Sequence, residues 1–183
     1  MEGNIQSQRT AIINMNKQLI KARFTKAVSS YDKEATVQRQ IAERMIKLIN
    51  EYISPNCSKL LEIGCGTGIF SRLLIRHIRP EWMIMNDICS EMEKNLSDII
   101  NENNIFICDD AEVFPFPKGM DSIASCSTIQ WFANLHSFFE RCHSSLNDGG
   151  FILFSTFGQN NMKEISSITE SVLPYRSKSE LER

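Results

Sequence analysis

The stretch "LEIGCGTG" (Leu61–Gly68) places three glycines at alternate positions directly after a short apolar run. An amphipathic segment, "IFSRLLIRHI", follows at once. A strand, a glycine turn and a helix in this order are the setting of a cofactor-binding turn, because glycine lets the backbone bend tightly and lets a ligand lie against it. The N-terminus of the following helix can receive an anion, such as the carboxylate of an amino-acid group. The stretch therefore predicts a ligand site at the turn.

The spacing of the glycines excludes two common phosphate-binding turns. A dinucleotide fingerprint, GxGxxG, needs its last glycine where Ile69 or Ser71 stands. A P-loop ends in glycine and lysine followed by serine or threonine, whereas this turn continues as "GIF". What remains is an acid, Glu62, followed by alternating glycines.

Short apolar runs alternate with amphipathic segments after residue 56. Such alternation indicates an α/β fold, with a parallel sheet covered by helices on both faces. The region from about residue 14 to 52 has a helical pattern interrupted at "SSYDKEA", so helices are expected before the sheet. Five runs are expected to be strands: "KLLEIG", "WMIMND", "NIFICDD", "DSIASCS" and "FILFSTF".

Two aspartates are placed to complete the predicted site. Asp87 ends the second run, about twenty residues beyond the turn, where a carboxylate can accept both ribose hydroxyls of a nucleotide. Asp110 ends the third run and is expected to accept the exocyclic amine of an adenine. Because ligands of such sheets lie across the carboxyl ends of the strands, the turn and both acids are expected to share one pocket.

The amino-acid composition argues against several classes of protein. A formal net charge of −2 gives no reason to expect a nucleic-acid partner. No apolar run reaches membrane-spanning length, and the polar start "MEGNIQSQRT" is not a secretory signal. Six scattered cysteines without a CxxC pair favour thiols in a reducing compartment, so a cytoplasmic protein is expected. Three histidines show no metal-ligand spacing, and no metal site is expected.

Several stretches together resemble a known family. "LEIGCGTG", "NDI", "DDAEVFPFP" and "NDGGFILFSTFG" are similar to the successive motifs of class I S-adenosylmethionine-dependent methyltransferases. "RFTKAVSSYDKEATVQRQIAERM", "STIQWFANL" and "FSTFG" resemble, more narrowly, the malonyl-acyl-carrier-protein O-methyltransferase family of biotin synthesis. The resemblance runs from Phe24 to Arg176, and its "YD…A..Q" and "QW" elements are more diagnostic than the glycines. It implies a Rossmann-like fold, S-adenosylmethionine as cofactor, and methylation of the free carboxylate of a malonyl thioester carried by an acyl-carrier protein.

The same resemblance implies roles for individual residues. An acceptor carboxylate is already ionised at neutral pH, so the expected reaction needs no general base. Three residues are expected at the acceptor: Tyr31 in an N-terminal lid, with Gln130 and Trp131 facing the substrate. Eight are expected at the cofactor: Glu62, Gly64 and Gly66 at the methionine end, Asp87 and Ile88 at the ribose and adenine, Asp110 and Ala111 at the adenine edge, and Ser127 through its backbone.

The resemblance also predicts the domain organisation. Residues 1–55 are expected to be a helical lid segment, and residues 56–183 the S-adenosylmethionine-binding domain. The family's domain continues beyond its fifth strand through a helix to two more strands, so these late strands are expected to be missing here. The fifth strand would then be an exposed edge through which the protein self-associates.

Two further expectations concern the partner and the acceptor. Acyl-carrier proteins are generally acidic, and the basic run Lys17, Lys21, Arg23 and Lys26 beside the lid is the expected docking surface. The cofactor motifs do not identify the acceptor. Another small-molecule methyltransferase and a non-catalytic cofactor-binding fragment therefore remain as alternatives.

Overall fold

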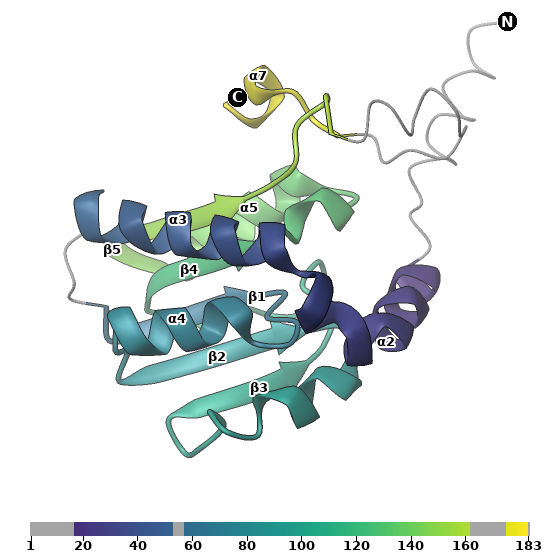
Figure 1. Ribbon diagram of the computed structural model, residues 1–183. Coiled ribbons are helices and arrows are strands. Elements are labelled where there is room, and N and C mark those ends of the chain that lie inside the picture. Colours follow the sequence, from purple (N-terminus) through teal and green to yellow (C-terminus); the bar gives the residue numbers. More distant parts are fainter. Residues whose placement is uncertain (1–16, 53–56, 162–174, 183) are drawn as a thin grey trace, which may run out of the picture.

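A parallel sheet of five strands forms the centre of the molecule (Figure 1). The computed structural model describes residues 17–52, 57–161 and 175–182. The strand order is β3-β2-β1-β4-β5, and every neighbouring pair is parallel. The expected fold class and the expected five strands are confirmed. The strands are β1 (Lys59–Ile63), β2 (Trp82–Asp87), β3 (Asn104–Cys108), β4 (Met120–Cys126) and β5 (Leu146–Ser155).

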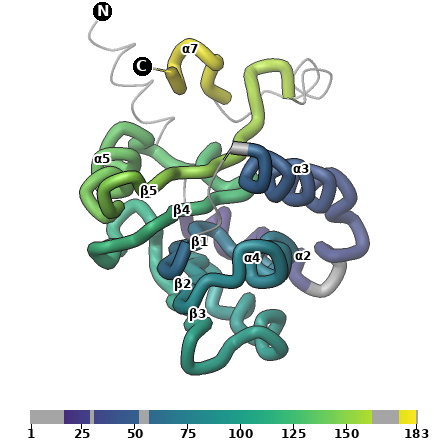
Figure 2. Tube along the Cα trace, turned by 90° about the vertical axis from the view of Figure 1, so that its left-hand side faces the viewer, coloured from purple at the N-terminus to yellow at the C-terminus, as the bar shows by residue number. Residues whose placement is uncertain are grey.

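Helices cover both faces of this sheet (Figures 1 and 2). Two of them, α3 and α4, lie on one face, and α5 lies on the other. Within the described residues no helix is both long enough and apolar enough to cross a membrane. The helices are α2 (Lys17–Glu34), α3 (Thr36–Tyr52), α4 (Ile69–His77), α5 (Leu135–Ser145) and the short α7 (Lys178–Leu181).

Strand β1 is buried on both faces because its side chains alternate between two apolar cores. Leu60 belongs to the core under α3 and α4, whereas Leu61 and Ile63 belong to the core under α5. Helix α3 contributes buried side chains such as Met45 to the first core. Of the segment expected to be a lid, α3 is thus part of the sheet domain's core, and residues 1–16 and 53–56 lie outside the described residues.

The amphipathic segment between β2 and β3 does not form an α-helix. The segment "SEMEKNLSDII" forms a 3₁₀ helix only over Ser90–Leu96. Arg72 of α4 donates from Nη2 to the carbonyl of Asn95 at 2.6 Å and also binds the carboxylate of Asp98. The amide of Ile99 bonds instead to the carbonyl of Leu96. A tertiary contact thus accompanies the loss of α-helical hydrogen bonding here.

The sheet order reverses at β1, which lies between β2 and β4. In open α/β sheets this switch point leaves a crevice at the carboxyl ends of the strands, and ligands bind there. The glycine turn follows β1 directly, so the fold carries the turn to this crevice.

Candidate functional site

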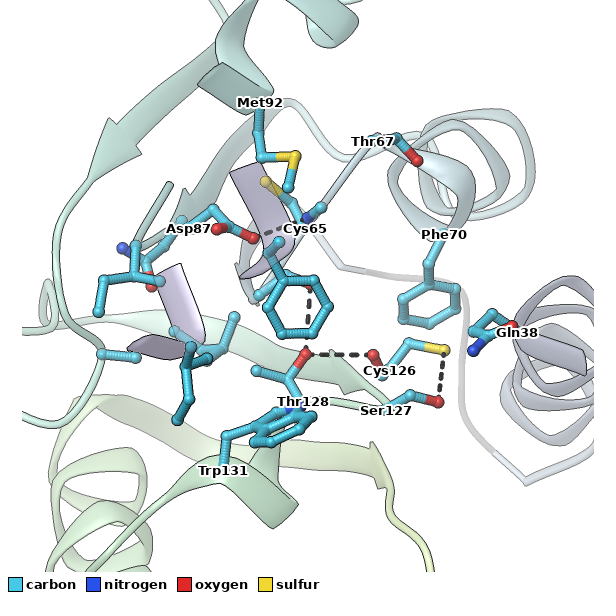
Figure 3. A pocket seen from close by; sticks show the side chains of 18 of the residues that line it. Gln38, Cys65, Thr67, Phe70, Asp87, Met92, Cys126, Ser127, Thr128 and Trp131 are labelled. Carbon is cyan, nitrogen blue, oxygen red and sulfur yellow. Dashed lines mark hydrogen bonds between the residues drawn. The ribbon is translucent and has the colours of Figure 1, made fainter. Parts of the chain in front are cut away.

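A pocket lined in part by α2 opens at the carboxyl ends of the strands (Figure 3). Nine of the eleven predicted site residues line it, and Glu62 and Gln130 do not. Among the described residues that line the pocket, the charged ones are Lys17, Asp87 and Asp110, and none is a histidine. The nine that line it are Tyr31, Gly64, Gly66, Asp87, Ile88, Asp110, Ala111, Ser127 and Trp131.

Two glycines of the turn are required for different reasons. Gly64 and Gly66 have φ angles of +71° and +53°, which L side chains rarely adopt. A Cβ on Gly64 would lie 2.2 Å from Oγ1 of Thr128, so packing excludes a side chain there. A Cβ on Gly66 would meet no heavy atom within 4 Å, because this backbone faces the open pocket. The space beside Gly66 is where a ligand can approach the turn.

Asn86 holds the turn and two strand ends together. Its carbonyl accepts hydrogen bonds from the amides of Gly64 and Cys65, at 2.8 and 3.0 Å. Its buried side-chain amide donates to the carbonyls of Ile107 and Asp109, at 3.1 and 2.9 Å. One residue at the end of β2 therefore fixes the glycine turn on one side and the end of β3 on the other.

Asp87 lies in the pocket with both carboxylate oxygens engaged by the backbone. Oδ2 accepts from the amide of Gly66 and Oδ1 from that of Cys89, each at 2.9 Å. Burial raises the pKa of Asp87, and these backbone hydrogen bonds oppose the rise. A carboxylate offers about four lone-pair positions, so each oxygen keeps one for a ligand. The side chain is fixed in orientation and still able to accept two ligand hydroxyls.

Asp110 follows β3 and is engaged by a lysine of the N-terminal helix. Nζ of Lys17 lies 2.6 Å from Oδ1 and 2.5 Å from Oδ2 of Asp110, and 2.7 Å from Oε2 of Glu112. The sequence predicted Lys17 to belong to a docking surface. It lines the pocket instead, because two carboxylates at the end of β3 attract its ammonium group. Arg23 and Lys26 of the same run are exposed, and Lys21 is half-buried.

Helix α2 borders the pocket. A few side-chain contacts attach it to the rest of the domain. Besides Lys17, Thr25 donates to Glu91 at 3.1 Å. Thr67 of the glycine turn donates to Asp32 at 2.6 Å. The ring of Phe24 meets Trp131 edge-on, with 5.6 Å between centroids.

Gln130 supports the loop after β4 instead of lining the pocket. Its Nε2 donates to the carbonyl of Ser127 at 2.5 Å, and its Oε1 accepts from Thr156 at 3.5 Å. Ser127 has a φ of +56°, which is uncommon for a residue with a side chain. Its amide donates to Ser155. The neighbours of Ser127 therefore hold it in this conformation, and Gln130 is one of them.

Glu62 is buried beneath the turn. It is 1% exposed, and its Oε2 has no hydrogen-bond partner among the described residues. Burial raises the pKa of Glu62 to about 8, with Ser71 beside it opposing the rise and the charge of Asp87 adding to it. Because β1 alternates its side chains, Glu62 shares the face of Leu60 and points into the core under α3 and α4.

The pocket is also lined by residues for which the sequence predicted no role. Gln38 of α3 and Phe70 of α4 face the end of β4 (Figure 3). Gln38 ends the "YD…A..Q" element and stands seven positions after Tyr31, which is two helical turns and hence the same side of a helix. That spacing is the signal that would have identified it. The described residues contain no group of three or more His, Cys, Asp or Glu side chains arranged to hold a metal ion.

Solved structures with the same fold include several methyltransferases. The structure titled "DhpI-SAM-HEP complex" aligns with a TM-score of 0.65 at 17% identity, over 87% of this chain and 82% of that one. The plantazolicin methyltransferase BpumL in complex with SAH aligns with a TM-score of 0.70 at 16% identity, over 96% of this chain and 74% of that one. At these identities the likeness concerns the fold alone.

Sequence comparison identifies nearer relatives. Residues 37–179 match the model of the methyltransferase domain family. The malonyl-[acyl-carrier protein] O-methyltransferase of Bacteroides thetaiotaomicron is 49% identical over 92% of this chain, which spans 65% of that protein's length. That of Bacteroides helcogenes is 39% identical over 92% of this chain and 70% of that protein. The chain therefore belongs to the methyltransferase domain family and, within it, to the group of malonyl-[acyl-carrier protein] O-methyltransferases.

Proposed function

We propose that this protein transfers a methyl group from S-adenosylmethionine to the free carboxylate of a malonyl thioester on an acyl-carrier protein, as a step of biotin synthesis. One observation carries the proposal. The accessible backbone of Gly66 and the carboxylate of Asp87, which its hydrogen bonds hold in place, line the same pocket. The names of the relatives from two Bacteroides species support the choice of acceptor.

The polar groups of the pocket suit S-adenosylmethionine. We assign Asp87 and Ile88 to the ribose and the adenine, and the backbone at Gly64 and Gly66 to the methionine end. Asp110 and Ala111 are assigned to the adenine edge. Because Lys17 occupies Asp110, the adenine amine has to share that carboxylate with the ammonium or displace it, and Glu112 offers the displaced ammonium a second partner. The acidic side chains of the pocket favour a cofactor that carries a positive sulfonium.

The bound cofactor supplies an electrophilic methyl group. The acceptor carboxylate is ionised at neutral pH, so no residue has to remove a proton from it. The task of the protein is then to align the acceptor and to exclude water. Helix α2 and the aromatic pair Phe24 and Trp131 cover the site for this purpose.

A methyl-transfer assay with several acceptors tests the proposal. Malonyl-acyl-carrier protein, malonyl coenzyme A and free malonate are compared at equal cofactor concentration, and methyl ester formation is measured. We expect the largest kcat/KM for the carrier protein. Transfer to none of them despite tight cofactor binding would support a non-catalytic cofactor-binding protein, and transfer only to an unrelated small acid would support another methyltransferase.

We further propose a cytoplasmic location and self-association through β5. All six cysteines are free thiols, five of them at least half-buried, as suits a reducing compartment. Among the described residues β5 pairs only with β4, so its other side is an unpaired edge. Light scattering at high protein concentration tests the second proposal: a clean monomer would contradict it.

A further inference from the structure

Among the described residues that line the pocket, several can donate hydrogen bonds, and none is a cation without a carboxylate partner. Lys17 is the only cationic side chain among the described lining residues, and two carboxylates already hold it. Three residues whose side chains carry a neutral hydrogen-bond donor line the same pocket: Gln38, Tyr31 and Trp131. Within the described part of the chain, none of the three donates a side-chain hydrogen bond to the protein.

Tyr31 of α2 and Gln38 of α3 lie on the same side of a continuous helical path, although they belong to two helices. The amide of Ala35 donates to the carbonyl of Tyr31 at 2.9 Å, and the amide of Arg39 donates to the carbonyl of Ala35 at 3.0 Å. Helical hydrogen bonds therefore continue across the boundary between α2 and α3. Seven positions are two turns, so both side chains face the pocket.

These three residues line the pocket together with Cys126 and Ser127 at the end of β4. The side chain of Gln38 points toward Cys126 and Ser127, beside the ring of Phe70 (Figure 3). Tyr31 lines the same pocket, and burial above all raises the pKa of its hydroxyl, with Cys126, Asp32 and Asp87 adding to the rise. The phenol therefore keeps its proton and can donate. Trp131 follows on the loop from β4 and contacts α2 through Phe24.

We propose that Gln38, with Tyr31 and Trp131, forms a neutral recognition site for the acceptor carboxylate, whose charge is balanced by the sulfonium of the cofactor and not by a cation of the protein. The inference rests on the proposed function and deepens it. Gln38 takes the role for which Gln130 was predicted, because Gln130 is engaged with Ser127 and Thr156.

A neutral site suits this reaction better than an ion pair. The carboxylate loses its negative charge as it accepts the methyl group. An ion pair with lysine or arginine would therefore weaken toward the transition state, and binding that is stronger in the ground state does not accelerate a reaction. A protein cation at this position would also repel the sulfonium. Neutral hydrogen bonds orient the carboxylate and lose less as its charge disappears.

Binding measurements test the inference without relying on turnover. Calorimetry is used to compare malonyl pantetheine thioester with its methyl ester on protein loaded with S-adenosylhomocysteine. The wild type should bind the acid more tightly than the ester. Gln38→Ala should weaken binding of the acid about tenfold or more, because a hydrogen bond to a charged group is lost, and should leave the ester and the cofactor nearly unaffected. Gln38→Glu should weaken acid binding further through like-charge repulsion.

Two controls separate the site from general effects of charge. Gln40→Glu introduces the same charge on the exposed side of α3 and should leave the preference for the acid unchanged. Loading the wild type with a positively charged amine analogue of the cofactor should tighten acid binding relative to S-adenosylhomocysteine, which is neutral at sulfur.

The outcomes distinguish the inference from the proposed function. A wild type that binds the acid no better than the ester overturns the inference whatever its activity. So does an unchanged preference in Gln38→Ala, or a Lys17→Met variant that loses the preference for the acid as fully as Gln38→Ala does. A protein that prefers the acid through Gln38 and transfers no methyl group contradicts only the proposed function.

Discussion

Replacing Glu62 by glutamine should stabilise the protein, by an amount that grows with pH. The side chain is 1% exposed in the middle of β1, and its Oε2 has no hydrogen-bond partner among the described residues. Burial raises the pKa of Glu62 from 4.5 to about 8. Glutamine has nearly the same shape and cannot ionise, so it removes the cost of a buried charge and keeps the packing.

The size and sign of the effect follow from the two protonation states. Between pH 4.5 and about pH 8 the folded protein keeps a proton on Glu62 that the unfolded chain releases, so the free energy of unfolding falls as pH rises through this window. Each unit of the pKa difference corresponds to about 1.4 kcal/mol. The difference between 4.5 and about 8 amounts to roughly 5 kcal/mol, lost in full above the higher pKa.

Urea unfolding of the wild type and Glu62→Gln at several pH values from about 5 to about 9 provides the measurement, because this range covers most of the window and extends beyond its upper end. The stability gained by the substitution should grow by about 1.4 kcal/mol per pH unit up to pH ~8 and then stay constant. Glu43→Gln, on the exposed side of α3, controls for the loss of one negative charge. A gain that does not change with pH, or one matched by Glu43→Gln, would show that Glu62 does not carry the raised pKa.

Three further predictions test the turn, the ribose site and the docking surface. Gly64→Ala should lower the free energy of unfolding by more than about 1 kcal/mol in urea titrations, because it combines a strained φ with a clash against Thr128; a neutral change would mean that the turn adapts. Asp87→Ala should weaken binding of S-adenosylmethionine by roughly 2 kcal/mol in calorimetry, with Asp87→Asn affected less, and equal affinities would exclude the ribose assignment. Arg23→Glu should reduce affinity for an acidic carrier protein at low salt, and the difference should shrink at high salt; affinity that does not depend on salt would contradict electrostatic docking.

Much of the fold and of the cofactor side of the pocket could be predicted because the signals are local. The glycines Gly64 and Gly66 and the aspartate Asp87 all stand at strand ends, and parallel strands bring those ends to one edge. Once the five runs are recognised as strands, the sequence order of these residues largely determines where they lie. Their roles with the cofactor remain predictions that the binding measurements test.

The acceptor side could not be predicted in the same way, because it depends on how α2 and α3 cross the sheet. Lys17 is one of four basic residues in sequence, and only the fold places it against Asp110 and Glu112. Gln130 and Gln38 are chemically identical, and only the path of the chain decides that Gln38 faces the pocket.

Helix α2 is attached by ion pairs and hydrogen bonds and by the contact of Phe24 with Trp131, in contrast to α3, which is packed into an apolar core. This contrast has a kinetic consequence. We expect a ligand beneath α2 to leave faster when the helix swings away, a movement that breaks ion pairs and hydrogen bonds and leaves the core intact. Residence time should therefore shorten as salt weakens the attachment, at salt concentrations that leave global unfolding unchanged. If opening limits turnover, moderate ionic strength would speed up successive cycles of catalysis even while it weakens encounter with an acidic carrier.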